Sequence, residues 1–197
     1  MRSTIILILG VSLLVWLLGM QEADQPPLPQ GHPPVAMPEE PAPPSEADPA
    51  DVASIEAIVT AYYDVISGDA GQTRNWDRFR SLFAKDARFI TVKSMGAKAS
   101  PVSLAPEQYV ELNRKYFERG GYHEREIHQR VDSYGKVAHV FSTYESRRKG
   151  DAPDPYSRGI NSIQLISNGQ RWWIASIMWD YERGDENPIP EDYLPDS

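Results

Sequence analysis

The chain has 197 residues, 41% of them hydrophobic and 10% aromatic, which is enough for one folded domain with appendages. Its formal net charge of −8 is unevenly spread, because residues 22–51 and residues 180–197 each contain seven acidic side chains, whereas residues 52–179 carry a formal +4. A charge of +4 over such a body lacks the concentrated basic stripe of nucleic-acid-binding proteins, so no nucleic acid partner is expected. The absence of cysteine excludes disulfides, thiolate zinc sites and cysteine nucleophiles.

The N-terminal region has the composition of an export signal. Arg2 precedes an apolar run over residues 5–18. One positive charge before a run of this length is typical of a secretory signal peptide, and a spanning helix usually needs about 20 apolar residues. Because no small-residue cleavage site follows, an uncleaved anchor with residues 5–20 in the membrane stays open. We therefore expect residues 1–23 to be a signal peptide or membrane anchor and the rest to be exported, periplasmic or extracellular.

A proline-rich acidic segment separates this region from the domain. Residues 26–49 contain 10 of the 17 prolines and almost no large apolar side chains. Such a composition cannot bury enough surface to offset its ordering entropy. We expect residues 24–50 to be a disordered linker, residues 51–183 to be the folded domain, and residues 184–197 to be an acidic C-terminal tail.

Helical periodicity predicts three helices at the start of the domain. The first has Asp51 as its N-cap and apolar side chains at i, i+3, i+4 and i+7 over residues 52–66. The second covers residues 76–83 behind an Asn75 cap. The third starts at Pro106, a residue suited to a helix first turn, and ends at Gly120.

The remaining pattern predicts strands. A short strand at residues 88–92 is followed by a loop at residues 93–105. From His123 the period changes to two, and four strands are expected at residues 123–133, 136–146, 158–167 and 170–181. Tyr134-Gly135 and Asn168-Gly169 are the expected two-residue turns. Helices followed by an antiparallel meander predict an α+β domain with the helices packed on one face of the sheet.

Three stretches of this sheet have a known pattern. They are Gly135-Lys-Val-Ala-His139, Arg158-Gly-Ile-Asn-Ser-Ile-Gln-Leu-Ile166 and Arg171-Trp-Trp-Ile-Ala-Ser-Ile-Met-Trp179. With the order of elements, they resemble the nuclear transport factor 2-like superfamily, which includes SnoaL-like and ketosteroid-isomerase-like proteins, over about residues 52–183. The resemblance implies a cone, in which three N-terminal helices pack in a strongly curved antiparallel sheet around a central pocket. It says little about activity, because members include isomerases, dehydratases, hydrolases, and transport and assembly domains.

The hairpin register predicts which side chains face the helices. Two-residue turns, with Thr143 opposite Asn161, place a more apolar set on one face, and burying apolar surface stabilises a fold by about 25 cal/mol per Å². We assign that face, which includes Ile160 and Ile177, to the cone interior. Its polar members and several aromatic side chains are the expected ligand-binding residues, although they could equally be ordinary core or rim residues: Tyr62, Trp76, Gln129, Ser142, Tyr144, Arg158, Ser162, Gln164 and Trp179.

The opposite face is mixed. It carries the titratable side chains Glu124, Glu126, His128, His139 and Glu145. It also carries the apolar side chains Phe141, Ile163, Leu165, Trp172, Ile174 and Met178. So much apolar surface is unfavourable in water, which predicts a homodimer through the sheet.

Metal and anion binding are both weakly indicated. Glu124, Glu126 and His128 would lie side by side and could bind metal or move protons. Charges that alternate along a strand are more typical of a solvated or dimer-rim surface, so we expect no metal site and no cofactor. The basic run of residues 147–149 could attract anions, but a solvated loop is the more common explanation.

The functional prediction depends on these faces. No Asp or Glu lies on the face assigned to the interior, where Tyr144 and a helical Tyr62 or Tyr63 are the only acid–base groups expected. This favours a non-catalytic exported domain that binds a small apolar or aromatic molecule or serves as an assembly module. The alternative is a small lyase or isomerase acting by proton transfer in the same pocket, and a third possibility is a partner-binding accessory domain. A register shift of one residue would favour catalysis.

Overall fold

The computed structural model describes residues 46–95 and 98–195. The expected signal peptide or anchor, residues 1–23, and most of the expected linker, residues 24–50, lie outside this part of the chain. Within the described part, none of the helices combines the length and the apolar character that crossing a membrane would require.

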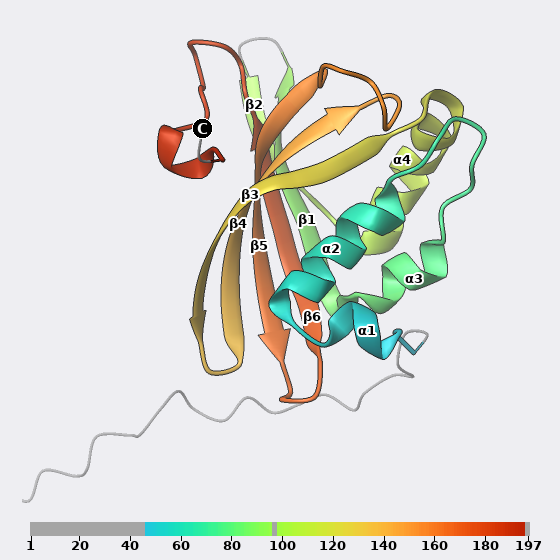
Figure 1. Cartoon of the computed structure of the whole chain (residues 1–197), viewed down its shortest axis with the longest axis vertical. Helices are drawn as coiled ribbons and strands as arrows, with labels where there is room; N and C mark the ends of the chain where they lie inside the picture. Colours follow the sequence, from blue (N-terminus) through green and yellow to red (C-terminus); the bar gives the residue numbers. More distant parts are fainter. Residues whose placement is uncertain (1–45, 96–97, 196–197) are drawn as a thin grey trace, which may run out of the picture. The chain divides into compact units, whose positions relative to one another are not determined.

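Three helices and two strands precede α4, and the strands that follow α4 form a meander before the C-terminal η1 (Figure 1). The helices are α1 (Pro49–Val52), α2 (Ile55–Ile66), α3 (Trp76–Ser81), α4 (Pro106–Gly120) and the 3₁₀ helix η1 (Glu191–Tyr193). The strands are β1 (Phe83–Met95), β2 (Lys98–Leu104), β3 (His123–Tyr134), β4 (Val137–Arg147), β5 (Ser157–Ser167) and β6 (Trp172–Tyr181). They form one sheet in the order β2-β1-β6-β5-β4-β3.

The sheet separates two environments. Helices α1 to α4 lie against one face, and the C-terminal segment with η1 lies against the other (Figure 1). All neighbouring strands are antiparallel except β1 and β6, which are parallel. The expected α+β class and the helix-covered curved sheet are therefore confirmed, whereas a purely antiparallel sheet is wrong at this one pairing.

The first expected helix is divided in two. Ser54 interrupts it with extended backbone, and its hydroxyl accepts a hydrogen bond from the Ala57 amide at 3.0 Å, so that α2 begins one residue later. Asp51, the expected N-cap, has a different role. It accepts two hydrogen bonds from the guanidinium of Arg78, at 2.7 and 2.9 Å, and these lower its pKa. The expected Asn75 cap of α3 is confirmed, with its side chain accepting from the Arg78 amide at 3.0 Å.

A strand replaces most of the loop expected at residues 93–105. Strand β2 pairs with β1, which is itself longer than the expected strand at residues 88–92. Pro101 lies within β2, opposite Val92. An edge strand tolerates proline because the missing amide is not needed for pairing there, and the small and basic residues around it give no apolar alternation to mark a strand.

The β3–β4 hairpin changes the expected faces halfway along. Its turn is Gly135-Lys136, one residue later than expected, which leaves most of β4 facing as predicted. The register then shifts between Glu126 and His128, so Ile127 forms a β-bulge. Because one extra residue reverses side-chain alternation, Glu124 and Glu126 face the helices and His128 does not.

Strand β5 also faces the other way. Asn161 lies opposite Ser142 rather than Thr143. Ile163 and Leu165 therefore face the helices and are fully buried, which corrects the expectation that the set containing Ile160 would do so. The register of β4 against β5 depends on the long connection at residues 148–156, whose length gives no signal for it.

A second irregularity lies in β6. The turn before it has four residues, 168–171, with the Asn168 side chain accepting from the amides of Gln170 and Arg171 at 2.8 and 3.0 Å. The register shifts by one at Ala175, so Ile174 and Ile177 both face the helices and are fully buried.

The outer face carries fewer of the predicted apolar side chains, and the C-terminal segment covers part of it. Ile163, Leu165 and Ile174, three of the apolar residues expected there, belong to the core. The Thr143 hydroxyl donates to the Tyr193 carbonyl at 2.6 Å, and the rings of Phe141 and Tyr193 lie 5.5 Å apart. Three of the six apolar side chains on which the homodimer prediction rests are therefore buried, while Ile160 and Ile166 take outer positions, and the dimer stays a prediction.

Candidate functional site

A cavity of about 240 Å³ lies between the sheet and helices α2 and α4. It is lined by Tyr62, Thr91, Leu104, Tyr109, Asn113, Tyr116, Phe117, Tyr122, Glu124, Tyr144, Tyr156, Asn161 and Trp179. Six of these side chains are tyrosines and one is a carboxylic acid. The cavity thus combines aromatic walls with several hydroxyl and amide groups, which is the composition of small-molecule sites.

Glu124 is the acidic group of this cavity and is 8% exposed. Its Oε2 accepts hydrogen bonds from the Tyr122 hydroxyl and, at 3.0 Å, from the Ser146 hydroxyl. Its Oε1 accepts from the Asn161 amide at 3.4 Å. Burial raises the pKa of Glu124, although these donors act in the opposite direction. A carboxyl group with a raised pKa can act as acid or base near neutral pH.

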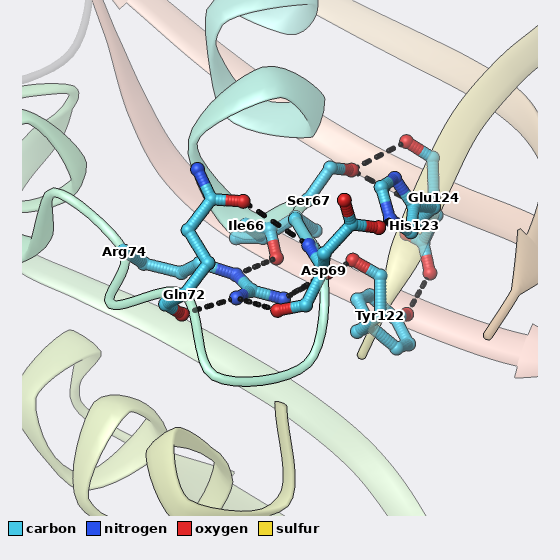
Figure 2. A network of polar contacts seen from close by, with 9 residues as sticks. Ile66, Ser67, Asp69, Gln72, Arg74, Tyr122, His123 and Glu124 are labelled. Carbon is cyan, nitrogen blue, oxygen red and sulfur yellow. Dashed lines mark hydrogen bonds and ion pairs between the residues drawn. The ribbon is translucent and has the colours of Figure 1, made fainter. Parts of the chain in front are cut away.

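The backbone of Glu124 is held by the end of α2 (Figure 2). The Ser67 hydroxyl accepts from the Glu124 amide and donates to the Glu124 carbonyl, both at 3.0 Å. Next to it, Gly68 and Tyr122 exchange two backbone hydrogen bonds of 2.8 and 3.0 Å. These contacts fix Glu124 and its donor Tyr122 relative to the helix.

A buried guanidinium supports the same turn. Arg74 donates to the carbonyls of Ile66 at 3.2 Å, Gln72 at 2.5 Å and Gly68 at 2.6 Å (Figure 2). The Ile66 and Gly68 carbonyls lie at the C-terminus of α2, where the helix dipole favours positive charge, and the Gln72 carbonyl lies in the loop that follows. Because Gly68 also pairs with Tyr122, Arg74 stabilises the turn that positions Glu124.

A hydrogen-bond chain runs behind the cavity wall. The Asn161 amide donates to the Tyr63 hydroxyl at 3.0 Å, and the hydroxyls of Tyr63 and Ser142 lie 2.7 Å apart. Ser142 in turn donates to Glu126, whose pKa is raised by burial. Glu126 lines a neighbouring groove, to which Glu124 also contributes, and does not line the cavity. Asn161 therefore bonds to Glu124 directly and to Glu126 through two hydroxyls.

The tyrosines of the cavity are neutral donors. Burial raises the pKa of Tyr62, Tyr109, Tyr122 and Tyr144 above the ordinary value, and that of Tyr156 to about 12. Their hydroxyls stay protonated at physiological pH. They can hydrogen-bond a polar ligand or stabilise an oxygen that gains negative charge.

Some of the expected ligand-binding residues lie in or next to this cavity. Tyr62, Tyr144 and Trp179 line it. Ser142 is buried and belongs to the hydrogen-bond chain behind the cavity wall. Gln129 lies opposite Ser142 in the pairing of β3 with β4, and its buried Oε1 has no hydrogen-bond partner within the described part.

The other expected residues lie elsewhere. Trp76 is a core side chain whose ring stacks near that of Phe117, with the two ring centroids 6.5 Å apart. Arg158 lies near the start of β5 and pairs with Glu182, with its Nε 2.9 Å from Glu182 Oε2. Ser162 and Gln164 lie on the outer face, next to His139, because the register of β5 differs from the expected one.

Sequence reasoning missed Glu124 and Asn161. Both were placed on the outer face, Glu124 because the bulge at Ile127 was not foreseen and Asn161 because of the register of β5. The same bulge separates Glu124 and Glu126 from His128. Across residues 46–95 and 98–195, no group of three or more His, Asp or Glu side chains is placed to hold a metal ion.

Comparisons with known proteins give the fold. No family model matches the sequence, and no curated protein matches it. Among solved structures, the Kfla4162 protein from Kribbella flavida is 15% identical, with a TM-score of 0.50 over 66% of this chain and 88% of that chain. A protein of unknown function with a cystatin-like fold from Nostoc punctiforme is 10% identical, with a TM-score of 0.49 over 66% and 90%. A nuclear transport factor 2-like protein of unknown function from Silicibacter pomeroyi is 13% identical, with a TM-score of 0.47 over 66% and 94%.

Likeness at such low identity shows the fold alone. Together with the element order and the curved six-stranded sheet, it supports the predicted cone fold, with helices on one face of the sheet. What the cavity does has to be argued from its own side chains.

Proposed function

We propose that the cavity binds a small organic molecule and that Glu124 transfers a proton to or from it. The observation that supports this is the buried carboxyl of Glu124 at the cavity wall, among neutral hydroxyl donors. A non-catalytic role was favoured only while the interior was thought to lack an acid. The volume of about 240 Å³ fits a single-ring molecule better than a drug-sized one, which needs about 300–1,000 Å³.

The arrangement suits proton abstraction next to a carbonyl group. The Glu124 carboxylate would take the proton, and a tyrosine hydroxyl would stabilise the negative charge that develops on the carbonyl oxygen. The Tyr122 hydroxyl is bonded to Glu124 and the Tyr116 hydroxyl to Arg148. The remaining hydroxyl groups of the cavity are those of Tyr62, Tyr109, Tyr144 and Tyr156.

Binding is tested with a set of single-ring alcohols, ketones and amides, observed by saturation-transfer NMR. Asn113→Trp fills the cavity from α4, whereas Leu112→Trp places the same ring on the exposed side of the same helix. We expect binding to wild type and to Leu112→Trp, and its loss in Asn113→Trp. Equal binding to all three chains would place the ligand elsewhere and contradict the proposal.

Proton transfer is tested by exchange of the α-protons of cyclohexanone and cyclopentanone in D₂O, followed by ¹H NMR. Positioned general bases contribute about 10²–10⁴-fold, so Glu124→Gln should reduce the protein-dependent rate by at least about 100-fold. Glu126→Gln is the matched control and should retain most of the rate. If bound ketones exchange no faster than free ones, the cavity is a binding site without this chemistry.

We also propose that the domain works outside the cytoplasm, on the basis of the apolar run at residues 5–18. Cell fractionation with mass measurement of the mature chain tests this. Recovery of the full-length chain in the cytoplasm would contradict it.

A further inference from the structure

An arginine covers two of the tyrosines that line the cavity. The guanidinium carbon of Arg148 lies 4.6 Å from the ring centroid of Tyr116 and 4.8 Å from that of Tyr156. One of its nitrogens also donates to the Tyr116 hydroxyl. Tyr116 comes from α4 and Tyr156 from the β4–β5 connection, so Arg148 joins the two sides of the cavity at this edge.

Within the described residues, Arg148 forms no ion pair. Among residues 46–95 and 98–195, no carboxylate lies within 4.0 Å of its guanidinium. Arg147, the preceding residue, differs in this respect because it pairs with Glu145. Stacking on two aromatic faces orients the Arg148 guanidinium and leaves most of its N–H groups available.

Arg148 also faces a groove of about 590 Å³ on its other side. Lys149 and His123 line this groove with it, as do Asp69 and Asp151. Asp69 is hydrogen-bonded to His123, with Oδ1 2.9 Å from the ring Nε2. The volume of this groove leaves room for a ligand group next to the guanidinium.

The cavity has room for a single ring, and its lining side chains are neutral apart from Glu124. A molecule whose ring lies in the cavity would extend toward this edge, where the Arg148 guanidinium lies. A guanidinium presents parallel N–H groups that match the two oxygens of a carboxylate or phosphate.

We propose that the ligand of the cavity carries a carboxylate or phosphate group, and that Arg148 binds this group at the edge formed by Tyr116 and Tyr156. The inference rests on the proposed function and adds the class of ligand. It assigns opposite ends of the molecule to two residues, the reacting end to Glu124 and the anionic end to Arg148.

The test compares benzoate with its neutral counterpart benzamide, and phenyl phosphate with phenol, by titration calorimetry at about 0.1 M salt. In at least one pair, we expect the wild type to bind the anion at least about tenfold more tightly than the neutral compound, which is the gain that a charge-assisted hydrogen bond would give. The pair with the larger preference identifies the anion as carboxylate or phosphate.

Arg148→Met keeps an apolar stem against the two rings and removes the charge. It should abolish the preference for the anion and leave benzamide or phenol binding within about twofold, which also shows that the variant is folded. Lys136→Met removes an exposed charge in the β3–β4 turn, lines neither the cavity nor the groove, and should change anion binding by less than about threefold.

Three outcomes separate this inference from the proposed function. Equal binding of anion and neutral counterpart to wild type, or an unchanged preference in Arg148→Met, overturns the inference and leaves the cavity proposal standing. Failure of all four compounds to bind, together with no binding in the NMR screen, removes both.

Discussion

The two faces of the sheet each bury a glutamate, and the two glutamates have opposite surroundings. Glu124 lies on the helix-covered face and is 8% exposed, while Glu145 lies on the outer face of the neighbouring strand and is 7% exposed. Glu145 accepts hydrogen bonds from the guanidiniums of Arg125 and Arg147. Glu124 accepts only from hydroxyl and amide groups.

The two carboxyls are similarly inaccessible to solvent, but Glu124 lies deep in the domain and Glu145 lies close to its surface, so their pKa values respond differently. Burial raises the pKa of both carboxyls, but at Glu145 the hydrogen bonds from Arg147 and Arg125 outweigh it and the pKa is lowered. At Glu124 the effect of burial prevails and the pKa is raised. A paired buried charge is a structural feature, whereas a buried acid without a counter-charge beside a cavity destabilises the fold and is more often found at functional sites.

The largest expected effect tests the assignment of the faces themselves. Ile163 is 0% exposed and Ile166, three residues along β5, is 41% exposed. Ile163→Ala should destabilise the domain by about 3 kcal/mol through lost burial and a cavity, and Ile166→Ala by less than about 1 kcal/mol. Urea unfolding followed by tryptophan fluorescence measures both. Similar costs at the two positions would break the comparison, because β5 would then face the other way.

A smaller loss is expected from breaking the outer pair. Glu145→Gln leaves the Arg147 guanidinium, whose side chain is only 11% exposed, without its counter-charge. We expect a destabilisation of about 2 kcal/mol in the same unfolding experiment. Arg125→Met is the control, because the Arg125 side chain is 69% exposed and its contribution should be below about 0.5 kcal/mol. A Glu145→Gln protein as stable as wild type would mean that this pair does not hold the outer face.

The smallest expected change in stability is a gain, and it comes from replacing Glu124. The raised pKa of Glu124 means that the native state holds this proton more tightly than the unfolded chain does. The resulting stability is fully present below the ordinary carboxyl pKa of about 4.3 and is lost as pH rises through the raised native pKa.

Glu124→Gln should therefore stabilise the domain above that native pKa, by about 3 °C in Tm at pH 8, and should have little effect near pH 4. Thermal unfolding followed by circular dichroism at the two pH values measures the difference. A lower Tm for Glu124→Gln at pH 8 would show that the carboxylate is stabilised in the fold and would remove the contrast with Glu145.

The sequence predicts the elements well where a period or a cap is visible. The α3 and α4 helices and the four-strand meander follow from apolar spacing, from Asn75 and Pro106, and from turn residues. Strand β2 lacks such a signal, because its small, basic and proline residues have the composition of a loop.

The candidate site is harder to predict because it depends on irregularities. Residues 123–126 are polar or charged at every position, so alternation gives no sign that the bulge at Ile127 reverses them. In β5, both alternating sets contain aliphatic and polar side chains, and only the pairing across residues 148–156 decides which set is buried. The titratable group of the cavity was thus visible in the sequence but assigned to the wrong side.

The contact between Thr143 and Tyr193 has a practical consequence for recombinant protein. A chain shortened at residue 183, the domain end suggested by composition, would lack the segment that accepts the Thr143 hydroxyl and covers Phe141. It would present a newly uncovered patch to other molecules in the sample. Self-association of such a shortened protein would then be produced by the truncation, so oligomerisation is best measured on chains that retain the segment to residue 195.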